Sequence, residues 1–336
     1  MFSSPSSPPR FRLDAWASDY VGSVDLEDGD DEESRRFEID TTIETPDWSK
    51  ALTCTPVERP KRIIFVDGVQ RTEVWGRIEV DGATIDAALG SVAVGAAISY
   101  EGRAEVAFDE PEYVRRVYAV AGAVSVEPLR LRIGSHEMVF EPAISDQHGR
   151  NGVGQALNNR RAELERTFAE KLADEDALVV LDGRLSYDPG PIHQVVGMAK
   201  TIHRNYLEGR PESSILGILG SCERTPVFRI SYGQTTRYSW YLRLPHTRNI
   251  HHSLAGIVRL ETPEIGRDAA IRLANLTSYH LPDFASQPQH DPRAPQNLVP
   301  IGALEKRLRH EMGDSVWLRR TIEDYLYDEY QKEAAP

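Results

Sequence analysis

Two aspartates occupy equivalent places in the sequence, each directly after a short apolar run. Asp67 follows the residues KRIIFV and precedes Gly68, and Asp182 follows ALVVL and precedes Gly183. Short β-branched runs bounded by turn residues predict buried strands, and ligands commonly bind at the ends of such strands. Two such strands can bring both carboxylates side by side, where a divalent cation offsets their repulsion. The alternative is that each Asp-Gly pair only forms a turn.

A helix predicted over residues 153–173 contains a third candidate carboxylate. Its apolar stripe covers about 80° of arc, and Glu165 falls about 20° beyond the edge of that stripe. Glu163 points to the opposite side by the same geometry, so Glu165 is the glutamate expected to face the sheet. The alternative is that Glu165 pairs with Arg161 or Arg166 on a solvated face. The stripe consists of Leu157, Leu164, Phe168 and Leu172.

A polar, proline-rich loop near the end of the chain holds adjacent candidate residues, His290 and Asp291. The prolines at 292 and 295 restrict the loop, and a histidine beside a carboxylate can complete a metal site or orient a water molecule. A helix is predicted over 191–207, where Lys200 is a candidate for contact with a phosphate backbone. The alternative for such a cation is ordinary solvation.

The composition is typical of a soluble protein, with 40% hydrophobic and 27% charged residues among 336. No apolar run approaches about 18 residues, so we expect no transmembrane helix, and the start of the chain lacks the apolar core of a signal peptide. The only cysteines are Cys54 and Cys222, with no paired spacing. This excludes a zinc knuckle and a disulfide framework, and it suits a cytoplasmic protein.

The net charge of -13 is unevenly distributed. Residues 1–50 hold 13 acidic and 5 basic residues, whereas the rest of the chain holds 39 and 34. A mildly acidic domain binds DNA weakly without help. The charge therefore favours either a protein that does not bind nucleic acid or one whose partner supplies part of the affinity.

The periodicities predict an acidic, largely flexible extension over 1–60, followed by one folded domain over 61–330. We expect strands at 61–66, 74–80, 90–100, 103–108, 137–142, 177–182, 226–243 and 254–262, with a hairpin turn at Asp81-Gly82. We expect the remaining helices at 264–276, 301–312 and 316–330. This mixture predicts an α/β (α+β) protein.

Three stretches taken together resemble the NurA nuclease family, whose members work with the hexameric ATPase HerA. They are FVDGVQR, the helix followed by VVLDGRLS, and HDPRAPQNLVPIGALEKRLRHEMGD, the last of which looks like the bacterial branch of the family. The resemblance covers roughly residues 60–315. It implies an RNase H-like mixed β-sheet core flanked by helices, with extra β and helical elements.

The resemblance also implies an activity and partners. Family members are Mn²⁺- or Mg²⁺-dependent deoxyribonucleases that degrade DNA from an end, usually 5′ to 3′. They form ring-like dimers and dock on a HerA-type translocase. We therefore expect a cytoplasmic exonuclease, with endonuclease activity as a further option, in DNA end processing or anti-phage defence.

The family's functional residues carry over to particular positions of this chain. Asp67, Asp182 and Glu165 match the acidic motifs, with Glu163 left open. The family's late histidine would fall near Gly302, so His290 and Asp291 are taken as its substitutes. The expected catalytic residues are Asp67, Glu165, Asp182 and His290. The expected metal ligands are Asp67, Asp182, Glu165 and Asp291. The expected DNA contacts are Arg71, Arg184, Lys200 and Arg293.

Carboxylate ligands suit hard divalent cations, and two of them can activate water and stabilise the leaving oxygen. Two alternatives use the same residue types. A non-catalytic adaptor would clamp DNA for a HerA-like ATPase and would bind no Mn²⁺ at Asp67 and Asp182. A carboxylate-pair hydrolase of sugars would need no metal.

Overall fold

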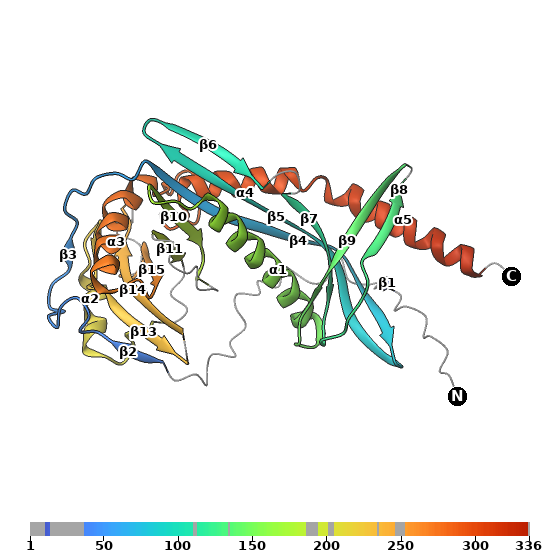
Figure 1. The fold of residues 1–336 in the computed structure, drawn as a ribbon, viewed down its shortest axis with the longest axis horizontal. Coiled ribbons are helices and arrows are strands. Elements are labelled where there is room, and N and C mark those ends of the chain that lie inside the picture. The colour runs from blue at the N-terminus through green and yellow to red at the C-terminus, as the bar shows by residue number, and fades with distance from the viewer. Residues whose placement is uncertain are drawn as a thin grey trace.

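The computed structural model describes residues 11–13, 37–109, 113–133, 135–185, 194–200, 205–233, 235–245 and 253–334. The molecule is elongated, with a large mixed sheet as its framework and helices along both faces (Figure 1). The helices are α1 (Gly149–Leu172), α2 (Ile215–Ile218), α3 (Arg267–His280), α4 (Val299–Glu311) and α5 (Ser315–Ala334). None of the helices in these ranges is both long and apolar enough to cross a membrane.

The strands are β1 (Phe11–Leu13), β2 (Glu38–Asp40), β3 (Leu52–Thr53), β4 (Arg62–Val80), β5 (Ala83–Tyr100), β6 (Arg103–Phe108), β7 (Val114–Val120), β8 (Leu129–Ile133), β9 (His136–Ile144), β10 (Ala177–Asp182), β11 (Val195–Ala199), β12 (Glu223–Arg224), β13 (Phe228–Tyr232), β14 (Thr235–Arg243) and β15 (Ile257–Pro263). Their order in the sheet is β2-β13-β14-β15-β11-β10-β4-β5-β7-β9-β8.

The centre of the sheet has the expected RNase H-like arrangement. β4 pairs antiparallel with β5 on one side and parallel with β10 on the other, and β10 pairs parallel with β11. The α/β fold class is therefore confirmed. The strands predicted over 226–243 and 254–262 and the helices predicted after residue 263 are also present.

β4 is much longer than predicted, because it does not end at Asp67. Its pairing with β5 runs from Ile63 opposite Ser99 to Val80 opposite Ala83, with one register shift just after Thr72. The Asp-Gly pair at 67 is therefore part of a strand, and the expectation that Asp67 terminates it is wrong. A side chain at 68 would meet a carboxylate of α1, which explains the glycine there. The predicted turn at Asp81-Gly82 is confirmed, with φ of 48° and 80°.

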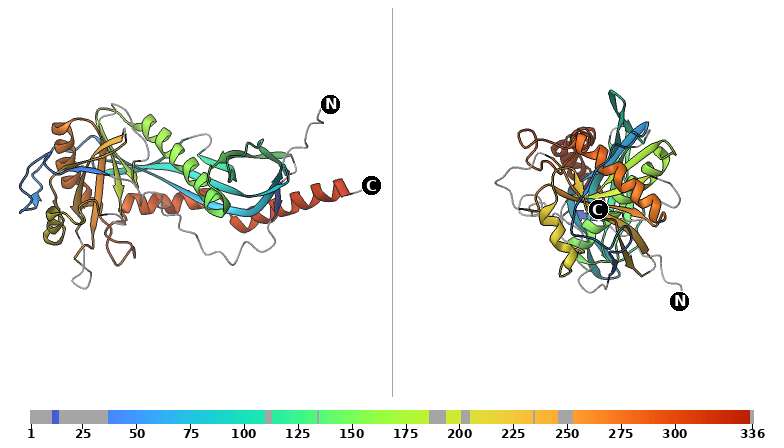
Figure 2. Two further views of the ribbon diagram at one scale, coloured as in Figure 1. Left: turned by 90° about the horizontal axis from the view of Figure 1, so that it is seen from below. Right: turned by 90° about the vertical axis from the view of Figure 1, so that its left-hand side faces the viewer.

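Alternate residues of β4 face two different cores. Ile63 and Phe65 pack with α3 and α4, whereas Ile64 and Val66 pack with α1. Figure 2 shows the same division, with α1 on one side of the long β4–β5 hairpin and α4 and α5 on the other. The sheet is thus buried on both faces, which is why its strands read as nearly continuous apolar runs.

The helix predicted over 191–207 is wrong in its central part, which forms the strand β11. Val195, Val196 and Met198 are buried, and β11 lies between β10 and β15. An apolar run buried on both faces of a sheet has no period that separates it from a buried helix. Residues 186–193 and 201–204, including His203 and Arg204, lie outside the described residues.

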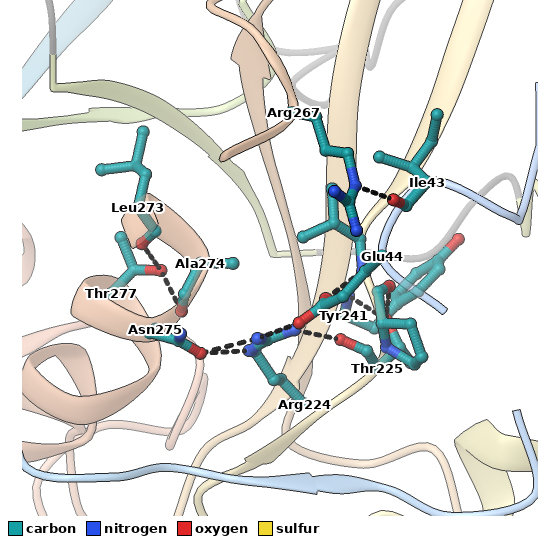
Figure 3. A network of polar contacts seen from close by, with 12 residues as sticks. Ile43, Glu44, Arg224, Thr225, Tyr241, Arg267, Leu273, Ala274, Asn275 and Thr277 are labelled. Atoms are coloured by element: carbon teal, nitrogen blue, oxygen red, sulfur yellow. Dashed lines mark hydrogen bonds and ion pairs between the residues drawn. The ribbon is translucent and has the colours of Figure 1, made fainter. Parts of the chain in front are cut away.

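Residues 37–60 belong to the folded domain, which differs from the extension expected over 1–60. β2 pairs with β13, and β3 pairs with β12. Arg224 is buried and donates two hydrogen bonds to Glu44, at 2.7 and 2.8 Å, and two to Asn275 on α3 (Figure 3). A buried bidentate ion pair needs such full compensation. It ties the segment before β4 to the sheet and to α3.

A second buried ionic network lies in the other half of the molecule, between β4, β5 and β7. Glu73 accepts two hydrogen bonds from Arg71 at 2.9 Å and one from Ser91, and it forms an ion pair with Arg116 at 3.8 Å. Both arginines also donate to main-chain carbonyls in the turn between α4 and α5. Arg71, expected to contact DNA, is thus engaged within the protein.

Candidate metal centre

Three carboxylates from three distant parts of the chain meet at the centre of the sheet. Asp67 on β4, Asp182 at the end of β10 and Glu305 on α4 each offer an oxygen within 4.8 Å of the others. The parallel register places Leu181 opposite Val66, so the next residues, the two aspartates, are neighbours. Asp67 lies at the level where β10 ends, which gives it access to the sheet edge although its own strand continues. The predicted juxtaposition of the two aspartates is therefore present in the structure.

Asp67 is the least compensated member of this group. It is 4% exposed, and its Oδ1 accepts a hydrogen bond from the backbone N–H of Gly68, at 2.8 Å. Its Oδ2 is buried and has no hydrogen-bond partner within the described ranges. Burial, together with repulsion from Asp182 and Glu165, raises the pKa of Asp67 well above its ordinary value. An orphaned carboxylate oxygen beside two further carboxylates fits a hard divalent cation such as Mn²⁺ or Mg²⁺.

The sequence reasoning missed Glu305, although a signal for it was present. The buried apolar side chains of α4, together with Met312 just after its end, cover about 80° of arc, and Glu305 falls about 20° beyond Met312 at the edge of that stripe. This is the same geometry that singled out Glu165 on α1. Arg293 donates to both oxygens of Glu305, at 3.2 and 2.8 Å. The buried residues of this stripe are Ile301, Leu304, Leu308 and Met312.

A side chain at the place expected for the family's late histidine would have to displace the amide of Asn297. A Cβ on Gly302 would lie 2.9 Å from Nδ2 of Asn297 and 3.5 Å from Oδ2 of Asp291. His290, the expected substitute, is exposed, and no contact joins its side chain to the three carboxylates in the part of the chain described. Glu305, one helical turn after Gly302, is the carboxylate that α4 contributes to the group.

A chain of hydrogen bonds connects Asp182 to Asp291. Lys200 donates to Oδ2 of Asp182 at 2.6 Å and to Oδ1 of Asn297 at 2.7 Å. Asn297 in turn donates to Asp291 at 2.7 Å. Burial alone would raise the pKa of Asp291. The hydrogen bonds from Asn297 and from the backbone of Arg293, with the positive charge of Arg293, outweigh this effect and lower the pKa of Asp291. Asp291, expected as a metal ligand, is thus connected to Asp182 only through the side chains of Lys200 and Asn297, and it is not a member of the carboxylate group.

Glu165 faces the sheet, as predicted. It lies on the face of the sheet that α1 covers, whereas Glu305 approaches from the face that α4 covers. It is 7% exposed, and its Oε1 lies so close to Gly68 that a Cβ there would be 2.6 Å away. Burial raises its pKa, and the ion pair with Arg161 opposes this rise. The pairing with Arg161 is therefore also present, but on a buried face and not on the solvated face that the alternative assumed. Glu163 pairs with Arg160 at 2.7 Å, half exposed to solvent.

An open cavity of about 630 Å³ adjoins the centre on the α1 side of the sheet. Asp182, Arg184 and Glu165 line it, so two of the predicted site residues share this cavity with a predicted DNA contact. Deeper in the cavity wall, Glu261 accepts a hydrogen bond from the backbone N–H of Leu185 at 2.7 Å. This bond fixes the chain just after Asp182.

The family model described as the NurA domain matches residues 115–301, more than half of the chain. Comparison with curated proteins gives no match. Among solved structures, the NurA nuclease from Sulfolobus solfataricus is similar, with 9% sequence identity and a TM-score of 0.45 over 85% of this chain and 89% of that chain. On the strength of the family match, this chain belongs to the NurA domain family.

Proposed function

We propose that this protein is a divalent-metal-dependent deoxyribonuclease. The observation that carries the proposal is the buried Oδ2 of Asp67, which has no hydrogen-bond partner in the described part of the chain and lies beside the carboxylates of Asp182 and Glu305. Placing one buried and two half-buried acids together is costly unless a cation compensates them. Membership of the NurA domain family supports phosphodiester hydrolysis as the reaction that such a cation serves.

In the proposed mechanism, Asp67, Asp182 and Glu305 would hold Mn²⁺ or Mg²⁺. The bound metal would supply an activated water and stabilise charge on the phosphate oxygens. Glu165 has a raised pKa, which suits its carboxylate to accept a proton from the attacking water. Lys200 lies 2.6 Å from Asp182 and can neutralise a non-bridging phosphate oxygen. Arg293 holds the carboxylate of Glu305 in place.

The proposed substrate is DNA, degraded from an end in the 5′ to 3′ direction, and the proposed partner is a HerA-like hexameric ATPase. The net charge of -13 supports the need for a partner, because an acidic chain gains little affinity from phosphate contacts alone. A homodimer in the cytoplasm, acting in DNA end processing or anti-phage defence, completes the proposal.

The test is cleavage of linear and circular DNA with Mn²⁺ or EDTA, with and without a HerA-type ATPase. Asp67→Asn should reduce cleavage by at least about 100-fold, because losing even an outer partner of a metal ligand commonly costs 10- to 100-fold. Glu163→Gln on the solvated side of α1 is the matched control and should retain activity. Undiminished cleavage by Asp67→Asn would overturn the assignment.

One observation favours a second candidate, a non-catalytic adaptor that clamps DNA for the ATPase. Lys200 pairs with Asp182 and Arg293 pairs with Glu305, so protein cations already compensate two of the three carboxylates. Titration calorimetry with Mn²⁺ separates the candidates. If the protein is the nuclease, the wild type should give a heat of Mn²⁺ binding that is lost in Asp67→Asn. If it is the adaptor, the wild type and Asp67→Asn should give the same result.

A further inference from the structure

The only two cysteines of the chain are 168 residues apart in sequence and lie next to each other in the fold. β3 pairs antiparallel with β12, and Thr53 lies opposite Glu223 in that pair. The same register continued by one residue places Cys54 opposite Cys222. The spacing of the cysteines in the sequence gives no sign of this, because the two segments become neighbours only through the sheet.

A direct contact joins the two residues. The thiol of Cys54 donates a hydrogen bond to the backbone carbonyl of Cys222, with 2.7 Å between sulfur and oxygen. Residues directly opposite each other on antiparallel strands have Cα atoms about 4.5–5.5 Å apart, within the range of about 4.4–6.8 Å that disulfides span. The spacing typical of such a pair therefore suits a disulfide.

The backbone at Cys222 is held in an uncommon conformation. Its φ of 63° lies in the left-handed region, which residues other than glycine rarely adopt. Its N–H donates to the carbonyl of Arg243 at the end of β14, at 2.8 Å. The N–H of Gly220 donates to the side chain of Glu223 at 2.6 Å and closes the same turn. Such a conformation persists only where its surroundings enforce it, so these bonds keep Cys222 in place beside Cys54.

Both thiols are within reach of a small reagent. Cys54 and Cys222 are each partly exposed, and the sulfur of Cys222 lies 3.6 Å from the hydroxyl of the exposed Ser221. Burial raises the pKa of the Cys54 thiol, so less of it is present as the reactive thiolate. We therefore expect Cys54 to react second, with a sulfur already activated on Cys222.

The pair lies beside the contacts that hold the segment before β4. Arg224 on β12 binds Glu44 through the buried bidentate ion pair (Figure 3). His280 on α3 donates a hydrogen bond to the backbone carbonyl of Val57 at 3.1 Å. The segment is thus held on both sides of Cys54. A covalent bond there would close a loop spanning 168 residues, and closing a long loop stabilises a protein by restricting its unfolded state.

We infer that Cys54 and Cys222 are a modification site, at which a low-molecular-weight disulfide oxidises them to a reversible, stabilising disulfide bond. The thiolate of Cys222 attacks one sulfur of the small disulfide and releases one small thiol. The thiolate of Cys54 then attacks the sulfur of Cys222, forms the bond and releases the second small thiol. Two protein thiols are oxidised, one small disulfide is reduced, and both protons leave on the small thiols.

A single reversible bond of this kind differs from the framework of several disulfides that the cysteine count excludes. A small thiol in excess reverses both steps and returns the two protein thiols. The inference does not depend on the proposed nuclease activity, because neither cysteine belongs to the carboxylate group.

The test uses the whole chain and oxidised glutathione as the probe. After incubation the protein is alkylated in denaturant, and mass spectrometry of the intact chain counts free thiols and glutathione adducts. The matched control is the double variant Thr53→Cys/Cys54→Ser. It keeps two thiols but moves one of them to the opposite face of β3, because successive side chains of a strand alternate between its faces. Cys54→Ser and Cys222→Ser are the single variants.

The wild type should lose both alkylatable thiols without gaining glutathione, and dithiothreitol should restore them. Cys54→Ser should instead retain one glutathione, on Cys222. The double variant should close its bond at least about tenfold more slowly, because its thiols do not face each other. The oxidised wild type should melt about 5 °C above the reduced form, as expected for a long closed loop in a chain of this size. Cys222→Ser should show no such difference.

Two free thiols in the oxidised wild type, or glutathione retained on both cysteines, would overturn the inference, and neither result depends on the folding of a variant. Closure of the double variant as fast as the wild type would also overturn it, because the native register would then have no role. An equal Tm for the oxidised and reduced wild type would overturn the stabilising role of the bond. None of these measurements involves cleavage of DNA, so the proposed function is tested separately.

Discussion

β4 carries two buried carboxylates six residues apart, and their surroundings differ. Glu73, in the half of the strand that packs near α5, accepts hydrogen bonds from Arg71 and Ser91 and pairs with Arg116. Asp67, in the half between α1 and α4, accepts a hydrogen bond from its neighbour Gly68, and its Oδ2 has no partner among the residues that the structure describes. A fully compensated acid stabilises the structure around it, whereas an uncompensated one marks a place where a ligand binds.

The largest effect on stability should follow from removing the compensated acid. Glu73→Ala leaves two arginines without their buried partner, and breaking such a pair costs about 3 kcal/mol in the free energy of unfolding. Asp67→Asn should lose no stability, because the change removes an uncompensated charge. Urea denaturation of both variants in EDTA measures the difference. A larger loss in Asp67→Asn than in Glu73→Ala would break the comparison.

A bound divalent metal should stabilise the folded protein only when Asp67, the uncompensated acid, is present. A ligand that binds the folded chain at about 100 times its Kd raises the free energy of unfolding by about 2.7 kcal/mol. We expect a rise of this order when saturating Mn²⁺ is added to the wild type, read as a shift of Tm. Asp67→Asn should show no such shift, and Glu163→Gln should show all of it.

The pH dependence of stability sharpens the same contrast. Because burial and the neighbouring acids raise the pKa of Asp67, the folded chain binds more protons than the unfolded chain between the ordinary pKa and the raised one. The free energy of unfolding of the metal-free protein should therefore fall as pH rises through this window. Glu165 contributes with the same sign. Urea denaturation in EDTA at several pH values should give a smaller fall for Asp67→Asn, and an equal fall would contradict the raised pKa.

The smallest effect belongs to an exposed acid. Glu163 pairs with Arg160 on the solvated side of α1, with its side chain 50% exposed. Glu163→Gln should change the free energy of unfolding by no more than about 0.5 kcal/mol, as is usual for surface ion pairs. Thermal denaturation would detect a larger change, which would mean that α1 presents a different face to the sheet.

The sequence predicted the parts of the site that depend on local pattern. The apolar runs before Asp67 and Asp182 predicted two neighbouring strands, and the period of α1 separated Glu165 from Glu163. Glu305 was within reach of the same helical argument but was not recognised, because the family resemblance directed attention to a histidine.

The parts that depend on pairing partners could not be predicted. Asp67 and Gly68 have the composition of a turn, and only the long partner strand β5 keeps them extended. The residues of β11 have the composition of a buried helix as much as of a strand, and their place between β10 and β15 decides between the two. The sequence also gave no sign that α1 and α4 approach from opposite faces of the sheet.

The three carboxylates of the centre stand at positions 67, 182 and 305 of a chain of 336 residues. During synthesis β4 and β10 leave the ribosome well before α4, so a growing chain that has not yet reached α4 lacks the third acid. A chain that is terminated early, or cleaved by a protease before α4, carries at most two of the three acids. If the proposed nuclease needs all three acids, a fragment that ends before α4 would be unable to act on DNA.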